Sequence, residues 1–206
     1  MELKLTTVSA FVEATASKEP TPGGGAIAAF TAATGAALAE MVANLTIDKK
    51  GYESVQEEMK TIQQQAEVIR NKALDLAEAD MQVFSTFMSA LGLPKETDEK
   101  KAKRTEALQA AYKDAANVPL EIGKLSYEIF DLAHAVVTKG NTNLVTDGVI
   151  AAINARAAVK SAFLNVRINL SGIKDSALVA DMTAYMDRVE ADLDERERQI
   201  VNLYKG

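Results

Sequence analysis

Apolar residues recur at intervals of three and four along almost the whole chain, and strand-like alternation is found almost nowhere. This spacing places the apolar side chains on one face of a helix. Glycine, proline and capping residues divide the pattern into helical segments. The predicted helices cover residues 7–17, 22–47, 53–91, 98–138 with a bend at Pro119, 143–170 and 175–204. The sequence therefore predicts a single all-α domain over residues 1–206, a bundle of long antiparallel helices.

Composition narrows the possible partners and chemistry. Hydrophobic residues make up 48% of the chain, but only 5% are aromatic, so we expect a core of Ala, Leu, Ile, Val and Met. The net charge of −6 argues against nucleic acid or an anionic membrane as partner. The lack of Cys excludes thiolate chemistry, and the single His134 argues against a metal site. We expect a cytoplasmic protein, because neither a signal-like start nor an apolar run of about 18 residues is seen.

Residues 20–35, PTPGGGAIAAFTAATG, join three consecutive glycines to a helix with very little side-chain bulk. A Walker-type phosphate loop is excluded, because no Lys-Ser or Lys-Thr follows at the required spacing. A helix that begins here would expose unpaired backbone N–H groups, which favour an anion. Its small residues would let a flat ligand approach the backbone. Tight helix packing without a ligand is the alternative interpretation.

One carboxyl group, that of Asp80, interrupts the apolar face of the predicted helix 53–91. That face comprises Ile62, Ala66, Ile69, Ala73, Leu76, Asp80, Val83 and Phe87. Burial raises the pKa of a carboxyl group toward the range that suits a general acid. Asp80 is therefore the candidate catalytic residue. The alternative is a buried polar residue that fixes the register between helices.

A polar face runs along the predicted helix 143–170. At helical spacing it carries Asn143, Asp147, Asn154, Ser161, Asn165 and Asn169, with small apolar residues between them. Amide groups donate and accept in a fixed plane, which suits recognition of the edge of a heterocycle. We predict a ligand-binding face, and an interhelical polar network in a dimer seam is the alternative. In the charged segment 95–104, Lys95 and Arg104 are candidates to meet an anionic ligand tail.

Four blocks of the sequence together resemble the cyclodeaminase/cyclohydrolase family of folate enzymes. They are PTPGGGAIAAFTAATGAALAEMVANLT, LAEADMQVFSTFMSALGLPKETDEKKAKR, VPL and GNTNLVTDGVIAAINARAAVKSAFLNVRINL. This family includes the carboxyl-terminal module of formimidoyltransferase-cyclodeaminase and stand-alone bacterial proteins. The resemblance covers nearly the whole chain in the family's order, and the blocks are specific in combination.

The resemblance implies an all-α homodimer that binds a tetrahydrofolate derivative as its substrate and needs no cofactor. Asp80, followed by Phe84, matches the Asp-x-x-x-Phe motif that carries the family's proposed proton donor. Thr146 and Ala26 depart mildly from the family pattern, which often has Ser at both places. With the residue patterns above, the resemblance assigns substrate binding to Pro22, Gly23, Gly24, Gly25, Lys95, Arg104, Asn141, Asn143, Asp147, Asn165 and Asn169.

The implied reaction is ring closure of 5-formimidoyltetrahydrofolate to 5,10-methenyltetrahydrofolate, with Asp80 as the general acid that assists release of ammonia. Hydrolysis of the methenyl bridge to 10-formyltetrahydrofolate is an alternative that would use the same cleft. A non-catalytic folate-binding helical dimer is a further alternative. Because the sequence has no formimidoyltransferase half, we do not expect transfer of the formimino group from formiminoglutamate.

Overall fold

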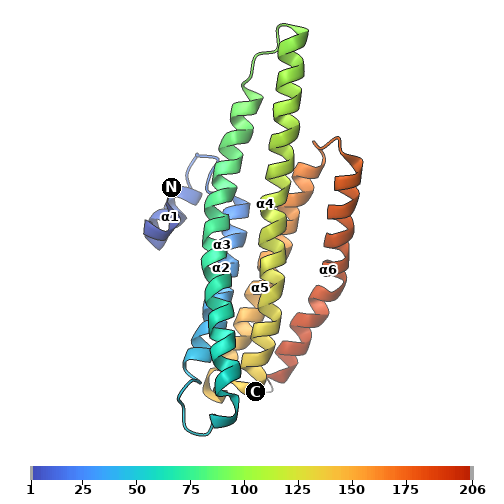
Figure 1. The fold of residues 1–206 in the computed structure, drawn as a ribbon. Helices are drawn as coiled ribbons and strands as arrows, with labels where there is room; N and C mark the ends of the chain where they lie inside the picture. The colour runs from blue at the N-terminus through green and yellow to red at the C-terminus, as the bar shows by residue number, and fades with distance from the viewer. Residues whose placement is uncertain (1, 205–206) are drawn as a thin grey trace.

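The structure, a computed structural model, describes residues 2–204 and consists of helices joined by short connections (Figure 1). The described residues contain no β-strand, which confirms the predicted all-α class. The helices are α1 (Val8–Thr15), α2 (Gly24–Asn44), α3 (Gln56–Leu91), α4 (Asp98–Lys139), α5 (Val145–Leu170) and α6 (Ser176–Leu203). Three 3-10 turns complete the described part: η1 (Leu3–Leu5), η2 (Glu53–Val55) and η3 (Thr142–Leu144).

Side-chain caps fix the beginnings of several helices. The Thr97 hydroxyl accepts a hydrogen bond from the N–H of Lys100 at the start of α4, and the Asp175 carboxylate caps α6 in the same way. Such caps satisfy backbone donors that have no partner within the helix. The bend expected at Pro119 does not divide α4, which runs without interruption from Asp98 to Lys139.

The long helices form two layers with α6 along one side. In the view of Figure 1, α3 and α4 lie in front of α2 and α5. Small residues allow the α2–α5 pair to pack tightly: a Cβ atom at Gly35 would lie only 3.2 Å from the carbonyl oxygen of Ala151. The alanines of α2 therefore serve close helix packing, which the sequence left open as one interpretation.

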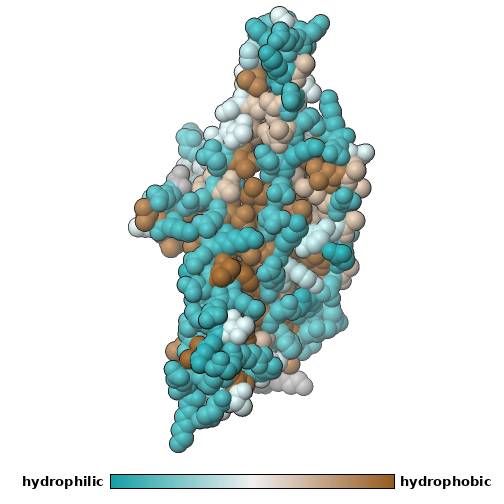
Figure 2. Space-filling model, in the orientation of Figure 1, coloured by the Kyte–Doolittle hydropathy of each residue, from teal (hydrophilic) through white to brown (hydrophobic). Residues whose placement is uncertain are grey.

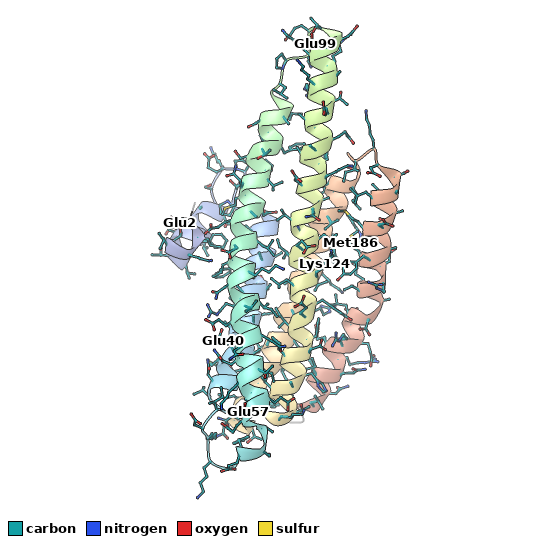
Figure 3. The ribbon with its side chains drawn as sticks, viewed as in Figure 1. Glu2, Glu40, Glu57, Glu99, Lys124 and Met186 are labelled. Carbon is teal, nitrogen blue, oxygen red and sulfur yellow. The ribbon has the colours of Figure 1, made fainter. Side chains whose placement is uncertain are left out.

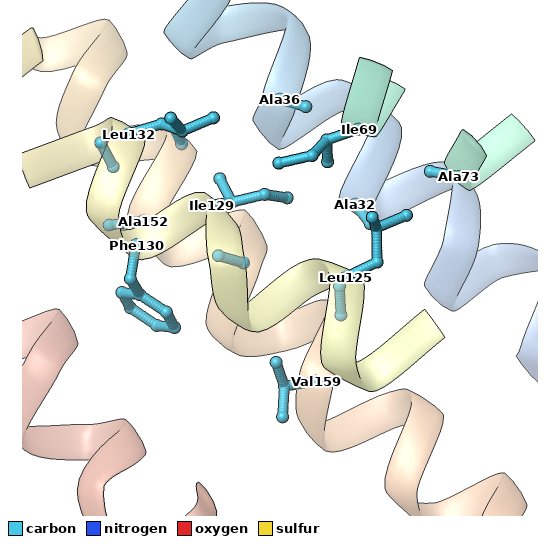
Figure 4. Close-up of a cluster of buried hydrophobic side chains, with 14 of the residues drawn as sticks. Ala32, Ala36, Ile69, Ala73, Leu125, Ile129, Phe130, Leu132, Ala152 and Val159 are labelled. Atoms are coloured by element: carbon cyan, nitrogen blue, oxygen red, sulfur yellow. The ribbon is translucent and has the colours of Figure 1, made fainter. Parts of the chain in front are cut away.

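The main core lies where the two layers meet. Ala32 and Ala36 of α2 face Ile69 and Ala73 of α3, and Ile129 of α4 lies among them (Figure 4). Because α2 contributes mainly methyl groups, the larger side chains of α3 and α4 fill the space between the layers. A smaller cluster at one end of α2 holds η1 and α1 against the bundle.

Two helices have the length and hydropathy of a membrane span, Gly24–Asn44 and the segment Thr142–Leu170. Half or slightly more of each apolar window is buried inside the bundle. These helices are α2 and α5, the back layer of the core, and their apolar character follows from that position.

The α3–α4 hairpin projects beyond the ends of α2, α5 and α6 (Figure 1). Every residue from Leu91 to Lys103 is exposed. Glu99 lies at the free end of the hairpin, whereas Glu57 lies near the opposite end of the bundle (Figure 3). At the free end, Glu99 and Lys103 of α4 form an exposed ion pair. Exposed ion pairs of this kind contribute little to the stability of the fold.

Candidate active site

A cavity of about 320 Å³ opens at the amino-terminal end of α2, between α3, α4 and α5. Gly23–Gly25 form one wall, Asp80 comes from α3, and Asn165 and Asn169 come from the last turns of α5. The structure thus brings together residues that the sequence singled out in three separate segments. Asp80 is the only titratable residue of the described chain that lines this cavity.

The carboxyl group of Asp80 lies directly against the backbone of α2. A Cβ atom at Gly25 would lie 2.1 Å from Asp80 Oδ1 and 2.4 Å from its Cγ, so only glycine leaves room for this carboxyl group. The sequence suggested that the helix start receives the carboxylates of a ligand tail. In the structure, the carboxyl group next to Gly25 belongs to the protein itself.

Two opposing influences act on the proton of Asp80. Burial raises the pKa of its carboxyl group, because the charged form loses water. A backbone hydrogen bond from Ala26, in the first turn of α2, acts in the opposite direction by stabilising the carboxylate. Burial is the larger influence, so the pKa lies above the ordinary value of an aspartate. This supports the protonated form that a general acid requires.

Asn169 satisfies a carbonyl group that Pro119 leaves without its helical partner. Proline has no N–H, so the carbonyl four residues earlier, at Ala115, lacks the usual helical hydrogen bond. Asn169 Nδ2 donates to this carbonyl at 2.9 Å and also to the carbonyl of Asn165 at 2.8 Å. This link between α4 and α5 fixes the side chain of Asn169 at the cavity wall.

Asn165 is held in a similar way. Its Nδ2 donates to the carbonyl of Ser161 at 2.8 Å, and its amide lies next to Gly24, where a Cβ atom would come within 3.3 Å of Nδ2. Asn169 Nδ2 uses both of its N–H groups, whereas Asn165 Nδ2 uses one, so a ligand could meet two amide oxygens and one remaining N–H of Asn165. The cavity wall therefore offers mainly acceptors, which suit the N–H donors of a ligand.

The opposite side of the cavity is apolar. Val83, Phe84 and Phe87 of α3 line it, and the ring of Phe87 packs edge-on against Tyr112 at a centroid distance of 4.8 Å. Ile168 of α5 completes the rim and is 73% exposed. A flat heterocycle could therefore lie between the aromatic side and the amide side.

Lys95 and Arg104 lie outside this cavity, on the projecting hairpin. Arg104 donates to the carbonyl of Leu91 at 3.0 Å. Leu91 follows Asp80 by eleven residues on α3, which corresponds to about 16 Å along the helix and nearly the same helical face. Neither cation therefore lies next to the carboxyl group of Asp80.

Asp147 lies in the first turn of α5 and Asn143 in η3 just before it, at the opposite end of α5 from the cavity. Eighteen residues separate Asp147 from Asn165, or about 27 Å along the helix. In one chain, the polar face predicted over 143–169 therefore does not form a continuous ligand site. Asn154, between them, donates to the Thr34 hydroxyl of α2 at 3.3 Å.

Asn141 and Pro22 lie outside the Asp80 cavity. Asn141 is buried, its N–H donates to Thr46 Oγ1 at 2.8 Å, and its side chain accepts the N–H of Asn143 at 3.2 Å. These contacts cap η3 and join the start of α5 to the end of α2. Pro22 is buried in the turn before α2 and lines a separate depression on the other side of that turn.

A larger groove of about 450 Å³ lies between α3 and α4, where apolar side chains show between polar ones in Figure 2. Val68, Ile69 and Leu132 form its apolar part, with Glu128 and Asp131 at the side. Asp131 already pairs with Arg196 of α6. None of the residues predicted for the site lines this groove. The smaller cavity at Asp80 is therefore the better candidate.

The cavity combines a carboxyl group whose pKa burial raises, amide groups and an aromatic wall. Within the described residues, no group of His, Cys, Asp or Glu side chains is placed to hold a metal ion. The arrangement suits proton transfer to a nitrogen-rich flat ligand. Sequence reasoning missed Ala115 and Val118 of α4 as wall residues. Pro119 in the middle of a helix was the available signal, because it marks an unpaired carbonyl at Ala115.

Comparison with known proteins supplies independent information. A sequence model of the family described as formiminotransferase-cyclodeaminase matches residues 7–188 of this chain. The chain is 38% identical over 200 residues to a methenyltetrahydrofolate cyclohydrolase from Methylorubrum extorquens, covering 97% of this chain and 96% of that protein. It is 32% identical over 189 residues to the formimidoyltransferase-cyclodeaminase of Sus scrofa. That match covers 92% of this chain but 34% of the pig protein, so the chain spans about a third of its length.

A solved structure agrees with this relationship. The crystal structure of a formiminotetrahydrofolate cyclodeaminase from Thermotoga maritima superposes with a TM-score of 0.87 at 33% sequence identity. The superposition covers 98% of this chain and 97% of the other. The helical arrangement around the cavity is therefore similar in the two proteins.

Proposed function

Since this chain belongs to the formiminotransferase-cyclodeaminase family, we propose that it converts 5-formimidoyltetrahydrofolate to 5,10-methenyltetrahydrofolate and ammonia at the Asp80 cavity. One observation carries this proposal: the carboxyl group of Asp80 is buried beside the glycine-rich start of α2. Burial raises the pKa of that carboxyl group. Its relatives bear the names of folate enzymes of this kind, which supports the substrate class.

The reaction needs one well-placed proton donor. N10 attacks the formimidoyl carbon, and the N10 proton moves to the formimidoyl nitrogen, which gives a tetrahedral carbon that bears an amino group. The Asp80 carboxyl group then protonates this amino group, the carbon–nitrogen bond breaks, and neutral ammonia leaves. The product carries a positive charge on its methenyl bridge, and the carboxylate of Asp80 that remains stabilises that charge.

The rest of the cavity would bind the pterin. Its N–H groups would donate to the amide oxygens of Asn165 and Asn169, and its plane would pack against Phe84 and Phe87. The p-aminobenzoyl group would follow α3 toward Leu91. The glutamate tail would then reach the neighbourhood of Arg104 and Lys95, on the helical face that Asp80 shares with Leu91.

Methenyltetrahydrofolate cyclohydrolase activity is the second candidate. A relative of that name is 38% identical to this chain over nearly the full length of both proteins. In that reaction, water adds to the methenyl carbon, one carbon–nitrogen bond breaks, and a proton is released as 10-formyltetrahydrofolate forms. This step needs a group that accepts a proton from water. A protonated Asp80 favours ring closure with release of ammonia, and an ionised Asp80 favours hydrolysis.

We also propose that the protein acts as a cytoplasmic homodimer. The parts of α2 and α5 that face away from the core expose apolar side chains, among them Leu45, Leu164 and Ile168. Exposed apolar surface of this extent is typical of a surface that contacts another protein.

A direct test follows the methenyl absorbance of purified protein with each folate substrate. If the protein catalyses ring closure, the absorbance should appear with 5-formimidoyltetrahydrofolate. If it catalyses hydrolysis, the absorbance of 5,10-methenyltetrahydrofolate should disappear. Asp80→Asn should lower kcat at least about a hundredfold, the usual scale for loss of a general acid. The matched control is Asp75→Asn, the same change on the same helix at an exposed ion pair with Lys4. No turnover with either substrate would overturn the proposal.

A further inference from the structure

The aromatic side of the Asp80 cavity lies farther toward the hairpin than the acid side. Asp80 rests against the first turn of α2, at Gly25. Phe87 follows Asp80 by seven residues on α3, which corresponds to about 10 Å along the helix. The α3–α4 hairpin projects beyond the end of α2 in this direction (Figure 1). The first turn of α2 therefore supports the carboxyl group of Asp80, and a different element has to support the ring of Phe87.

Tyr112 of α4 supplies this support. Its ring packs edge-on against Phe87, with a centroid distance of 4.8 Å and an angle of 66° between the ring planes. Edge-to-face pairs of this kind are favourable beyond the apolar area that they bury. Phe87 lines the cavity and Tyr112 does not. Tyr112 therefore contacts the wall of the cavity without being part of its lining.

Gly172, in the turn after α5, lies against the same ring. A Cβ atom at this position would overlap Cε1 and Cζ of Tyr112. The φ angle of Gly172 lies outside the left-handed region, so the backbone itself would accept another residue. The space that the Tyr112 ring occupies is what requires glycine here.

The turn that contains Gly172 is tied to α4 by two further side chains. Gln109 Nε2 donates to the carbonyl of Gly172 at 2.8 Å, and Gln109 Oε1 accepts the N–H two residues later, also at 2.8 Å. Lys113 forms an ion pair with Asp175 at 2.8 Å. Gln109 and Lys113 lie on the same face of α4 as Tyr112, at helical spacings of three and four residues. The turn is therefore held behind the ring, which limits how far the ring can move away from α3.

We propose that Tyr112 is a positioning residue for the heterocycle of the substrate. Its ring, backed by Gly172, holds Phe87 at the distance from Asn165 and Asn169 that a flat ring system needs. This inference rests on the proposed function for the identity of the ligand. Tyr112 acts through Phe87, and its hydroxyl group takes no part.

The two sides of the cavity are thus supported separately. Gly25 leaves room for the acid, whereas Tyr112 and Gly172 hold the aromatic wall. Contacts with the heterocycle are made in the bound substrate and in the transition state alike. Loss of such a contact raises KM and leaves kcat nearly unchanged. Changes at Tyr112 should therefore affect binding, and changes at Gly25 should affect kcat.

Two substitutions of Tyr112 test this role. Tyr112→Leu should raise KM, and the Kd for tetrahydrofolate, about three- to tenfold, which is the scale of one aromatic contact. Its kcat should stay within about twofold of wild type, because Asp80 keeps its place. Tyr112→Phe should restore wild-type values, because it retains the ring. Tetrahydrofolate lacks the one-carbon unit and cannot react, so calorimetry gives its Kd without any turnover.

Tyr127→Leu is the matched control. It makes the same change on the same helix, at another edge-on pair, that of Tyr127 with Phe130 at a centroid distance of 5.9 Å. Tyr127 lies fifteen residues from Tyr112, or about 22 Å along α4, and does not line the cavity. The Kd and KM of this variant should equal those of wild type.

A double-mutant cycle tests the contact with Gly172. Gly172→Ala should raise the Kd toward that of Tyr112→Leu, because the new methyl group displaces the ring. In a Tyr112→Ala background the space is free, so the same change should have no further effect on the Kd. This arm reaches the ring without removing it, so the test does not depend on the folding of Tyr112→Leu.

Several results would overturn the positioning role. They are an unchanged Kd in Tyr112→Leu, a fall of kcat in place of affinity, a weak-binding Tyr112→Phe, and additive effects of the changes at Gly172 and Tyr112. If wild type binds tetrahydrofolate but turns over neither folate substrate, the proposed function fails, and the Kd values still decide the role of Tyr112. A wild-type protein that does not bind tetrahydrofolate would overturn both.

Discussion

The first turn of α2 leaves no room for a side chain at Gly25, because the carboxyl group of Asp80 occupies that volume. If Asp80 is the general acid, as we propose, Gly25 is a positioning residue for its carboxyl group. It allows the carboxyl group to reach the N–H of Ala26 while the rest of the side chain stays among apolar groups. The requirement for glycine comes from this contact and not from an unusual backbone conformation.

Gly25→Ala should therefore impair catalysis more than folding. The new methyl group would displace the Asp80 carboxyl group by an ångström or more, and a misplacement of that size can cost about a hundredfold in rate. We expect kcat to fall at least tenfold, with a far smaller change in KM. Gly92→Ala is the matched control, since a Cβ atom there would meet its nearest neighbours at ordinary distances of 3.6 and 3.7 Å. Equal kcat values for the two variants would contradict the positioning role.

The raised pKa of Asp80 has a measurable effect on stability. The folded state binds this proton more tightly than the unfolded state, where the pKa lies near 3.8. As the pH rises from 3.8 toward the raised pKa, the Asp80 carboxyl group ionises in the unfolded chain while it still holds its proton in the folded protein. The free energy of unfolding of wild type should therefore fall relative to that of Asp80→Asn across this window and then level off. Denaturant titrations of both proteins at several pH values would show this difference, and a constant difference would contradict the raised pKa.

Among the elements, α4 receives a hydrogen bond from a side chain of another helix at the turn that contains Pro119. Pro119 removes one backbone donor, and Asn169 of α5 supplies a replacement to the carbonyl of Ala115. The same amide forms part of the cavity wall. The hydrogen bond that satisfies the carbonyl of Ala115 therefore also fixes a side chain of the cavity wall.

A double-mutant cycle tests this link. Asn169→Leu should reduce the free energy of unfolding by about 1–3 kcal/mol, because it leaves the carbonyl of Ala115 without a donor. In a Pro119→Ala background, the backbone N–H of residue 119 can bond to that carbonyl, so the same change should cost much less. We expect a coupling energy of at least about 1 kcal/mol from chemical denaturation. Additive effects would show that the carbonyl is satisfied in another way.

Helix boundaries were largely predictable because they depend on local signals. The segments expected at 53–91, 98–138 and 143–170 correspond to α3, α4 and α5 within a few residues. Caps such as Thr97 and breaks such as Gly140 are visible in the sequence itself. Pro119 is the exception. The sequence shows that a hydrogen bond is missing there, but only the tertiary structure shows that Asn169 replaces it.

At the scale of the whole molecule, the stability of the protein should be unevenly distributed. The core-facing sides of α2 and α5 are buried, whereas residues 91–103 at the free end of the hairpin are all exposed. Hydrogen exchange should therefore be fast over residues 92–104, with opening free energies close to zero. In α2 the opening free energy should approach that of global unfolding. Mass spectrometry of peptides from both regions would measure this, and equal protection would contradict it.

The candidate site was only partly predictable, because it depends on the distance between segments. The sequence identified Asp80, the glycines and Asn165 by residue type and spacing, and the structure brings them to one cavity. Helical periodicity could not show that Asn143 and Asp147 lie far from that cavity in the same chain. Periodicity fixes the face on which a residue lies, whereas its position along the axis relative to other helices depends on packing.

The projecting hairpin also divides the cavity between two stretches of chain. Residues before its turn carry the glycines and Asp80, and residues after it carry Ala115, Asn165 and Asn169. A chain cut within residues 92–97 would be severed at an exposed loop far from the core, where nicking is best tolerated. Neither fragment would hold a complete cavity. The two fragments should regain turnover only when they reassociate, so turnover would measure their reassociation.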